Sequence, residues 1–284
     1  MEIHKAAVLG FGTMGSEIAV LLALAGIDTV CYDPYKEAFT RNMPRIEAFV
    51  QKQRKLSEEE KANAIARLFT TCHMNDVRSA DFIIEASLEM KDIKMKLLNE
   101  LGEVTDETTI VATNTSSMSI SELASMYKYP SRFLGLHFFN PATTMSLVEV
   151  VPGMLTDDES FNVASALIER IGKHPIKVKE TPGFVVNRVL IALMFEAVAL
   201  LDEGIATIED IDIAMRRGAG FPLGPFKLAD LVGLDVLLHA GEMLYAELGN
   251  IKFKPPYSLK KMVAAGYLGK KSGRGFYDYS KEGE

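Results

Sequence analysis

Residues 5–15 read KAAVLGFGTMG, a short apolar run followed at once by three closely spaced glycines. The run predicts a buried strand, and residues 16–25 continue as an apolar segment of helical length that Gly26 closes. A second apolar run, residues 27–32, predicts another strand and ends at Asp33. A strand, a glycine turn, a helix and a second strand within about thirty residues predict the first unit of a parallel α/β sheet.

The glycines have the spacing GxGxxG, which suits a dinucleotide. The first permits a tight turn, the second lets the backbone approach a pyrophosphate, and the third lets the helix pack closely on the strand. The N–H groups at the helix start would face the phosphates. Asp33 would accept the ribose hydroxyls and repel a 2′-phosphate, which favours NAD over NADP; FAD shares the fingerprint and is the main competitor. The cofactor-binding residues predicted here are Gly10, Gly12, Thr13, Met14, Gly15 and Asp33.

Strands and helices alternate in the pattern as far as residue 182. Further strands are predicted at 81–85, 109–113, 133–138, 147–151 and 175–179. Helices are predicted within 35–68 and at 91–101, 119–127 and 156–171, with capping boxes at Ser57–Glu60 and Ser119–Glu122. After Thr181-Pro182-Gly183 the periodicity becomes helical, at 184–203, 207–217, 226–248 and 258–265. We therefore predict a Rossmann-like, doubly wound α/β domain at residues 1–182 and an all-helical domain at 183–284.

Composition excludes several classes of protein. The net charge of −7 argues against non-specific binding to nucleic acid or to an anionic membrane. The start MEIHKAAVLG does not resemble a signal peptide, and the apolar stretch 184–201 contains Asn187, Arg188 and Glu196, which favours a buried helix over a membrane span. Two scattered cysteines suit a reducing compartment. We expect a cytoplasmic protein.

Two ionisable residues stand in apolar runs, His137 in FLGLHFFNP and Glu149 in LVEVVPG. Both runs predict strands, where an ionisable side chain is costly unless it has a partner. Twelve residues separate the two, which leaves room for a connection and a return strand. The carboxylate would then fix the tautomer of the imidazole and raise its basicity, which predicts a general base.

Polar residues near this pair extend the candidate active site. Ser116 follows the strand 109–113, at the edge of the sheet where ligands bind in open α/β folds. Asn187 lies near the start of an apolar helix, where an amide is unusual without a partner. A G-x-S-x-G nucleophile elbow is absent, and the other histidines lack the spacing of metal ligands, so we predict neither a serine hydrolase nor a metal site.

The chain resembles the L-3-hydroxyacyl-CoA dehydrogenases that act on short-chain substrates, including bacterial 3-hydroxybutyryl-CoA dehydrogenases. The resemblance runs almost end to end. It is carried by GFGTMG with Asp33, IIEASLEMKDIK, ATNTSSMSI, GLHFFNP followed by LVEVV, TPGFVVNR, GAGFPLGPFKLADLVGLD and GKKSGRGFYDY. Together these motifs are far more specific than the glycine fingerprint alone.

The resemblance implies NAD-dependent oxidation of L-3-hydroxyacyl-CoA to 3-oxoacyl-CoA, or the reverse reduction of acetoacetyl-CoA. His137 would exchange the proton of the 3-hydroxyl while a hydride passes between C3 and the nicotinamide, and Glu149 would orient His137. Ser116 and Asn187 would hold the substrate oxygens. The same resemblance assigns further cofactor contacts to Glu89, Lys94, Asn114, Asn140 and Lys271.

Coenzyme A carries a 3′-phosphate and a pyrophosphate, so its binding site needs cations. The segment QKQRKL supplies Lys52, Arg54 and Lys55, although a solvated helix face explains the same charges equally well. In the resembling family this region contacts the coenzyme A end, but the match is loose, and Phe49 stands where some relatives carry a serine. The chain also reads ATTMS after Pro141, where many members of the resembling family have a proline-rich segment ending in lysine, so we expect a shifted acyl-chain preference.

Two alternatives stay open from the sequence. The first is a dehydrogenase of a hydroxy acid without coenzyme A, such as carnitine or a sugar acid, on the same fold with the same His–Glu pair. The second is a non-catalytic, crystallin-like relative, which need not keep Ser116, His137, Glu149 and Asn187 together. The resemblance further implies a homodimer formed through the helical domain, and closure of the two domains on substrate about residues 181–183.

Overall fold

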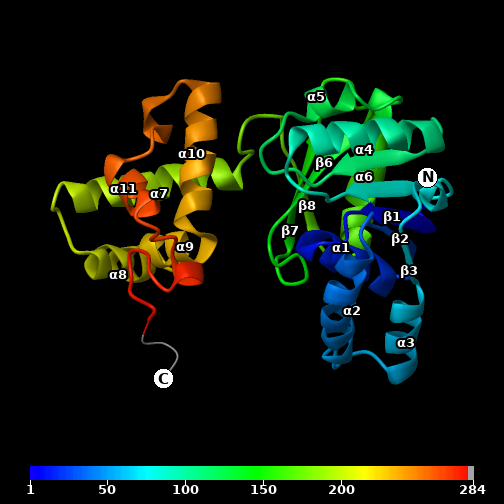
Figure 1. Cartoon of the computed structure of the whole chain (residues 1–284), viewed down its shortest axis with the longest axis horizontal. Helices are drawn as coiled ribbons and strands as arrows, with labels where there is room; N and C mark the ends of the chain where they lie inside the picture. Colours follow the sequence, from blue (N-terminus) through cyan, green and yellow to red (C-terminus); the bar gives the residue numbers. More distant parts are fainter. Residues whose placement is uncertain (281–284) are drawn as a thin grey trace. The chain divides into compact units, whose positions relative to one another are not determined.

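The computed structural model describes residues 1–280 and divides into two compact units, Met1–Thr181 and a second that begins at Pro182 (Figure 1). The first unit alternates strands and helices. Its strands are β1 (Lys5–Leu9), β2 (Asp28–Tyr32), β3 (Leu68–Thr71), β4 (Phe82–Glu85), β5 (Ile110–Thr113), β6 (Phe133–Phe138), β7 (Leu147–Pro152) and β8 (His174–Lys177). Its helices are α1 (Thr13–Leu24), α2 (Lys36–Gln51), α3 (Glu58–Ala66), α4 (Lys91–Val104), α5 (Ile120–Ala124) and α6 (Asp158–Arg170).

The strands form one eight-stranded sheet in the order β3-β2-β1-β4-β5-β6-β7-β8. The strands from β3 to β6 are parallel, β7 runs antiparallel to β6, and β8 is parallel to β7. The predicted Rossmann-like, mainly parallel sheet is confirmed. Because the carboxyl ends of parallel strands share one edge, the glycine turn after β1, Asp33 after β2 and the loop after β5 lie along the same edge.

Helices cover both faces of the sheet. One face packs on α1 and α6 through a continuous core that includes Ile18, Leu22, Leu134, Leu136 and Leu167. The opposite face of β6 packs closely on α5. A Cβ added to Gly135 of β6 would lie only 2.7 Å from Cδ1 of Ile120 on α5. Side chains alternate along a strand, so His137 points to the same face as Gly135.

The second unit is helical, as predicted. It contains α7 (Val186–Asp202), α8 (Ile208–Gly218), α9 (Pro225–Val232), α10 (Leu234–Leu248) and α11 (Tyr257–Ala264). Its core joins α7, α9, α10 and α11 around Phe195, Leu237, Leu244 and Leu259. Within the described residues, 1–280, no helix combines the length and apolar composition that a membrane crossing requires.

The structure differs from the sequence predictions in four places. Helix α1 begins at Thr13, directly after the glycine turn, and not at residue 16. Residues 68–71, expected in a helical region, form the edge strand β3. The helix expected at 226–248 is broken at Gly233, whose φ of +105° disrupts a right-handed helix. Finally, the capping box is complete at Ser57, whereas at Ser119 only the serine half forms, because Lys91 takes the carboxylate of Glu122.

Candidate active site

The turn after β1 has the geometry that a dinucleotide needs. Gly10 has φ +92°, and a Cβ there would lie 2.8 Å from the backbone of residues 86 and 87. A Cβ on Gly15 would lie 1.8 Å from the Gly10 carbonyl oxygen, so this glycine lets α1 approach β1. A Cβ on Gly12, in contrast, would have no atom of the described residues within 4 Å. The space beside Gly12 is therefore open for a pyrophosphate at the start of α1.

Asp33 is positioned by the same turn. Its Oδ2 accepts the backbone N–H of Phe11 at 2.8 Å, and its Oδ1 accepts that of Tyr35 at 3.0 Å. The side chain of Asn42 on α2 donates to the Phe11 carbonyl at 2.8 Å, which fixes the turn from the other side. These bonds hold the Asp33 carboxylate at the end of β2, while each oxygen retains a further lone pair for a ribose hydroxyl.

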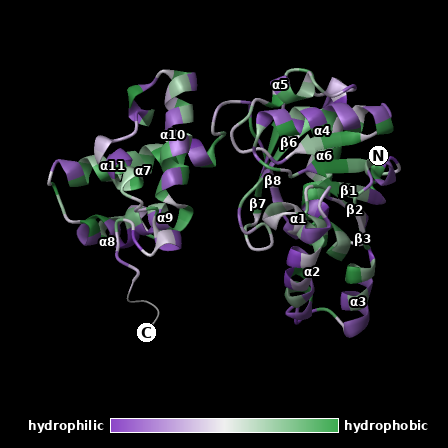
Figure 2. Cartoon of the chain, in the orientation of Figure 1, coloured by the Kyte–Doolittle hydropathy of each residue, from purple (hydrophilic) through white to green (hydrophobic). Residues whose placement is uncertain are grey.

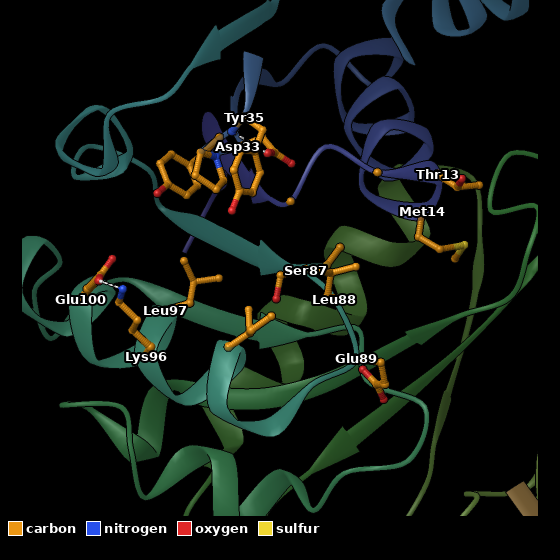
Figure 3. A pocket seen from close by; sticks show the side chains of 16 residues that line it. Thr13, Met14, Asp33, Tyr35, Ser87, Leu88, Glu89, Lys96, Leu97 and Glu100 are labelled. Atoms are coloured by element: carbon orange, nitrogen blue, oxygen red, sulfur yellow. Dashed lines mark hydrogen bonds and ion pairs between the residues drawn. The ribbon is translucent and has the colours of Figure 1, made fainter. Parts of the chain in front are cut away.

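A cavity of about 620 Å³ runs along this edge of the sheet. Asp33 and Tyr35 lie at one end, and Glu89 lies away from them beyond Ser87 and Leu88 (Figure 3). Leu97 of α4 forms part of another wall. The predicted cofactor residues that line the cavity are Gly10, Gly12, Thr13, Met14, Asp33 and Glu89. A cavity lined by the glycine turn, the start of α1 and the Asp33 carboxylate fits a dinucleotide.

Lys94 lies behind the cavity wall and not in it. Its side chain is 1% exposed, and Nζ lies 2.8 Å from both carboxylate oxygens of Glu85 and 3.4 Å from Oε2 of Glu89. Glu85 also accepts hydrogen bonds from Ser87 and Thr113. Lys94 therefore reaches the cofactor cavity only through Glu89. Sequence analysis missed Glu85, although a carboxylate that closes the apolar strand FIIE was a signal.

Glu89 ties the loop after β5 to the cofactor cavity. Its Oε1 accepts the Thr115 hydroxyl at 2.5 Å, the Ser116 N–H at 3.0 Å and the Ser117 hydroxyl at 3.0 Å. Burial raises the pKa of Glu89, but the Lys94 ammonium and these hydrogen bonds outweigh burial and lower the pKa. The carboxylate thus stays ionised and fixes the backbone of Ser116.

His137 and Glu149 form a buried pair across two strands. They are directly opposed Cα partners in the antiparallel ladder of β6 and β7, and Nδ1 of His137 lies 2.6 Å from Oε2 of Glu149. Glu149 is fully buried and His137 is 5% exposed. The imidazole also packs edge-on against Phe139, with ring centroids 4.6 Å apart. A carboxylate on Nδ1 fixes the tautomer that leaves Nε2 able to accept a proton.

Asn114 joins the two halves of this site. It follows β5, and its Oδ1 accepts the Phe138 N–H at 2.9 Å. This amide was predicted as a cofactor contact, and the structure shows that it holds the end of β6 beside His137. The loop of Ser116 and the strand of His137 are therefore fixed to one another.

The remaining predicted residues lie in other parts of the chain. Asn140 is exposed in the connection between β6 and β7, and Lys52, Arg54 and Lys55 are exposed in the hydrophilic turn between α2 and α3 (Figure 2). In the second unit, Asn187 is the second residue of α7. Lys271 of that unit is paired with Asp235, with Nζ at 2.6 and 2.7 Å from its two oxygens.

A second carboxylate that sequence analysis missed holds the far end of the Ser116 loop. Glu180 accepts the Ser119 hydroxyl at 2.6 Å and the Ser121 N–H at 3.0 Å, and it also bonds the Ser121 hydroxyl. Burial raises the pKa of Glu180, but these hydrogen bonds outweigh it and lower the pKa. The residue immediately precedes Thr181-Pro182-Gly183, so the loop is anchored to the segment that leads into the second unit.

Comparison with known proteins agrees with this geometry. The NAD-binding domain model of 3-hydroxyacyl-CoA dehydrogenase matches residues 5–181, and the C-terminal domain model of the same family matches residues 183–279. A 3-hydroxybutyryl-CoA dehydrogenase of Clostridioides difficile is 42% identical over 98% of this chain and all of its own. One of Bradyrhizobium diazoefficiens is 39% identical over 98% and 96%. The crystal structure of (S)-3-hydroxybutyryl-CoA dehydrogenase PaaH1 from Ralstonia eutropha superposes with a TM-score of 0.96 at 41% identity, covering 99% of this chain and all of that one.

Proposed function

Since the chain belongs to the NAD-dependent 3-hydroxyacyl-CoA dehydrogenase family, we propose that it interconverts short-chain L-3-hydroxyacyl-CoA and 3-oxoacyl-CoA with His137 as the acid/base. The observation that carries the proposal is the buried pair of His137 and Glu149, placed on the strand next to β5 and its Ser116 loop. The full-length relatives named 3-hydroxybutyryl-CoA dehydrogenase support a four-carbon acyl group.

The proton follows the geometry of the pair. The Nδ1–H of His137 donates a hydrogen bond to Glu149 and keeps its proton, so the proton of the substrate 3-hydroxyl passes to Nε2 and an imidazolium forms. The positive charge that develops on the imidazole is stabilised by the buried Glu149 carboxylate. In the reverse direction the imidazolium returns the proton to the forming alkoxide.

When bound, NAD would supply the acceptor for the hydride that leaves C3 of the substrate. The chain's own part is to bind and align: Gly12 and the start of α1 hold the pyrophosphate, Asp33 holds the ribose, and Glu89 lies at the opposite end of the cavity. We assign Ser116 and Asn187 to the substrate oxygens. The Ser116 loop is suited to this task because Glu89 and Glu180 fix it at both ends.

The first unit is thus the NAD-binding domain, and we assign substrate binding and dimerisation to the helical unit. Exposed apolar side chains of that unit support a homodimer, among them Val185, Val189, Ile205, Ile213, Leu223, Leu231, Val232 and Val236. Sedimentation equilibrium tests the dimer. We further propose a cytoplasmic enzyme, consistent with free Cys31 and Cys72.

Kinetics test the function directly. The protein should reduce acetoacetyl-CoA with NADH and leave carnitine and free 3-hydroxybutyrate unchanged. Replacing His137 with Gln should lower kcat by orders of magnitude while NADH still binds. The exposed His174 provides the matched control, because its replacement with Gln should leave kcat unchanged. Activity near wild type in the His137 variant, or turnover of carnitine alone, would contradict the assignment.

A further inference from the structure

A second, smaller cavity lies beside the connection between the two strands of the acid/base pair. Its volume is about 240 Å³, and it is bounded by α1, α2 and residue 143 of the connection 139–146. The lining residues are Glu17, Arg45, Ile46, Ala48, Phe49, Lys52 and Thr143. Lys52, which we assigned to the coenzyme A end of the substrate, therefore shares a cavity with the connection that follows His137.

Glu17 is the buried charge of this cavity. It lies in the otherwise apolar helix α1 and is 6% exposed. Its Oε1 is paired with the guanidinium of Arg45 on α2, and its Oε2 accepts the Thr143 N–H at 3.3 Å. A buried carboxylate is costly unless its partners are kept, so Glu17 holds α2 and the connection against α1.

The connection is fixed at a second point by the opposite charge. Nζ of Lys173 donates to the Met145 carbonyl at 2.8 Å. Burial lowers the pKa of Lys173, and the nearby Glu17 carboxylate partly offsets this. A carboxylate thus binds the N–H of Thr143 while an ammonium binds the carbonyl two residues later. The ATTMS segment supplies an N–H at 143 that a proline could not.

We propose that Glu17 is a positioning residue that sets the affinity for the acyl-CoA. It holds the Arg45 guanidinium, whose side chain is 47% exposed, in the cavity wall, and it fixes Thr143 opposite. Removal of the Glu17 charge by substitution would weaken the contacts that hold Arg45 and Thr143, and the cavity between them would change shape. The dinucleotide cavity shares no lining residue with this one and should be unaffected. The inference rests on the proposed function, because it concerns the acyl-CoA of that reaction.

The effect should separate the two substrates. Glu17→Gln and Arg45→Met should each raise the KM for acetoacetyl-CoA about tenfold, because small displacements of positioning groups are costly. The KM for NADH and the kcat should stay within about twofold of wild type, since His137 and Glu149 are unaltered. The double variant should be no worse than either single variant, because the two side chains act as one unit. Arg45→Lys, which keeps the charge, should recover most of the affinity.

Controls make the result decisive. Arg41→Met is the matched control: Arg41 is exposed one turn earlier on α2 and is absent from the lining of this cavity, so the KM for acetoacetyl-CoA should be unchanged. Should Glu17→Gln fail to fold, Arg45→Met carries the test alone, because Arg45 is half exposed. An unchanged KM for acetoacetyl-CoA, or an equal rise in the KM for both substrates, would overturn the inference. Failure of the proposed function is distinct, since the wild-type protein would then be inactive on acetoacetyl-CoA.

Discussion

Replacing Glu149 with Gln tests the central electrostatic argument. The substitution keeps the size of the side chain and allows a hydrogen bond to Nδ1 of His137, but it removes a fully buried negative charge 2.6 Å from that atom. At an effective dielectric of about 20, unit charges about 4 Å apart attract by about 4 kcal/mol. That attraction acts on the imidazolium and not on the neutral imidazole. Its loss should therefore lower kcat by about three orders of magnitude.

The assay is the steady-state reduction of NAD by L-3-hydroxybutyryl-CoA, the direction in which the imidazolium forms, accompanied by titration of NADH binding. The dissociation constant of NADH should not change, because Glu149 is absent from the residues that line the cofactor cavity. Glu149→Asp keeps the charge on a shorter side chain and should retain more activity than the amide. Glu169→Gln, on the exposed face of α6, is the matched control and should be fully active.

One result would refute the reasoning. If Glu149→Gln folds, binds NADH normally and keeps kcat within about tenfold of wild type, less than about 1.4 kcal/mol of the barrier depends on the charge. The buried carboxylate would then serve the packing of β7, and another group would stabilise the proton on His137.

Three further predictions concern other parts of the chain. Gly12→Ala should weaken NADH binding at least about tenfold, because the new Cβ would enter the open space assigned to the pyrophosphate. The melting temperature should not change, and fluorescence titration measures the dissociation constant of NADH. Gly275→Ala should destabilise the helical unit by about 1–3 kcal/mol in urea unfolding, because the new Cβ would lie 1.9 Å from Oδ1 of buried Asp230. Gly218→Ala is the control and should not destabilise it, since a Cβ there would have no atom of the described residues within 4 Å. The pKa of Glu89 is lowered on folding, so its carboxylate adds stability above its ordinary pKa of 4.5 and loses that contribution as pH falls through the folded value. The melting-temperature deficit of Glu89→Gln should therefore be present at pH 7 and shrink toward pH 4, and an equal deficit at both would contradict it.

The sequence predicted the sheet well because its signals are local. The glycine turn, the strand before it and Asp33 after it form one continuous segment, and His137 and Glu149 stand out against apolar neighbours. The edge strand β3 was missed because half of its side chains face solvent, with Phe69 52% exposed, so its four residues show no burial pattern. The break at Gly233 was missed because apolar periodicity continues on both sides of it.

The missed site residues depend on long-range contacts. Glu17 and Thr143 are 126 positions apart, and Glu180 and Ser119 are 61 apart. Each of these carboxylates looks like an ordinary surface charge until the topology places its partner beside it. Lys94 illustrates another long-range effect: its motif predicts a cofactor contact, and the fold adds ion pairs of its ammonium with Glu85 and Glu89.

The reversal of strand direction after β6 is what creates the acid/base pair. A parallel continuation would need a crossover of about a dozen residues or more, and would carry the next strand away from the catalytic edge. The connection 139–146 is shorter than that, so β7 returns antiparallel and its Glu149 falls directly opposite His137. The register of such a strand pair is set by the apolar pattern of its strands and by the geometry of the connection. Glu17 and Lys173 both bind that backbone, and Glu17 and Thr143 also line the cavity that Lys52 shares. The connection 139–146 therefore places Glu149 opposite His137 and, under our proposal for Glu17, also affects the binding of the acyl-CoA.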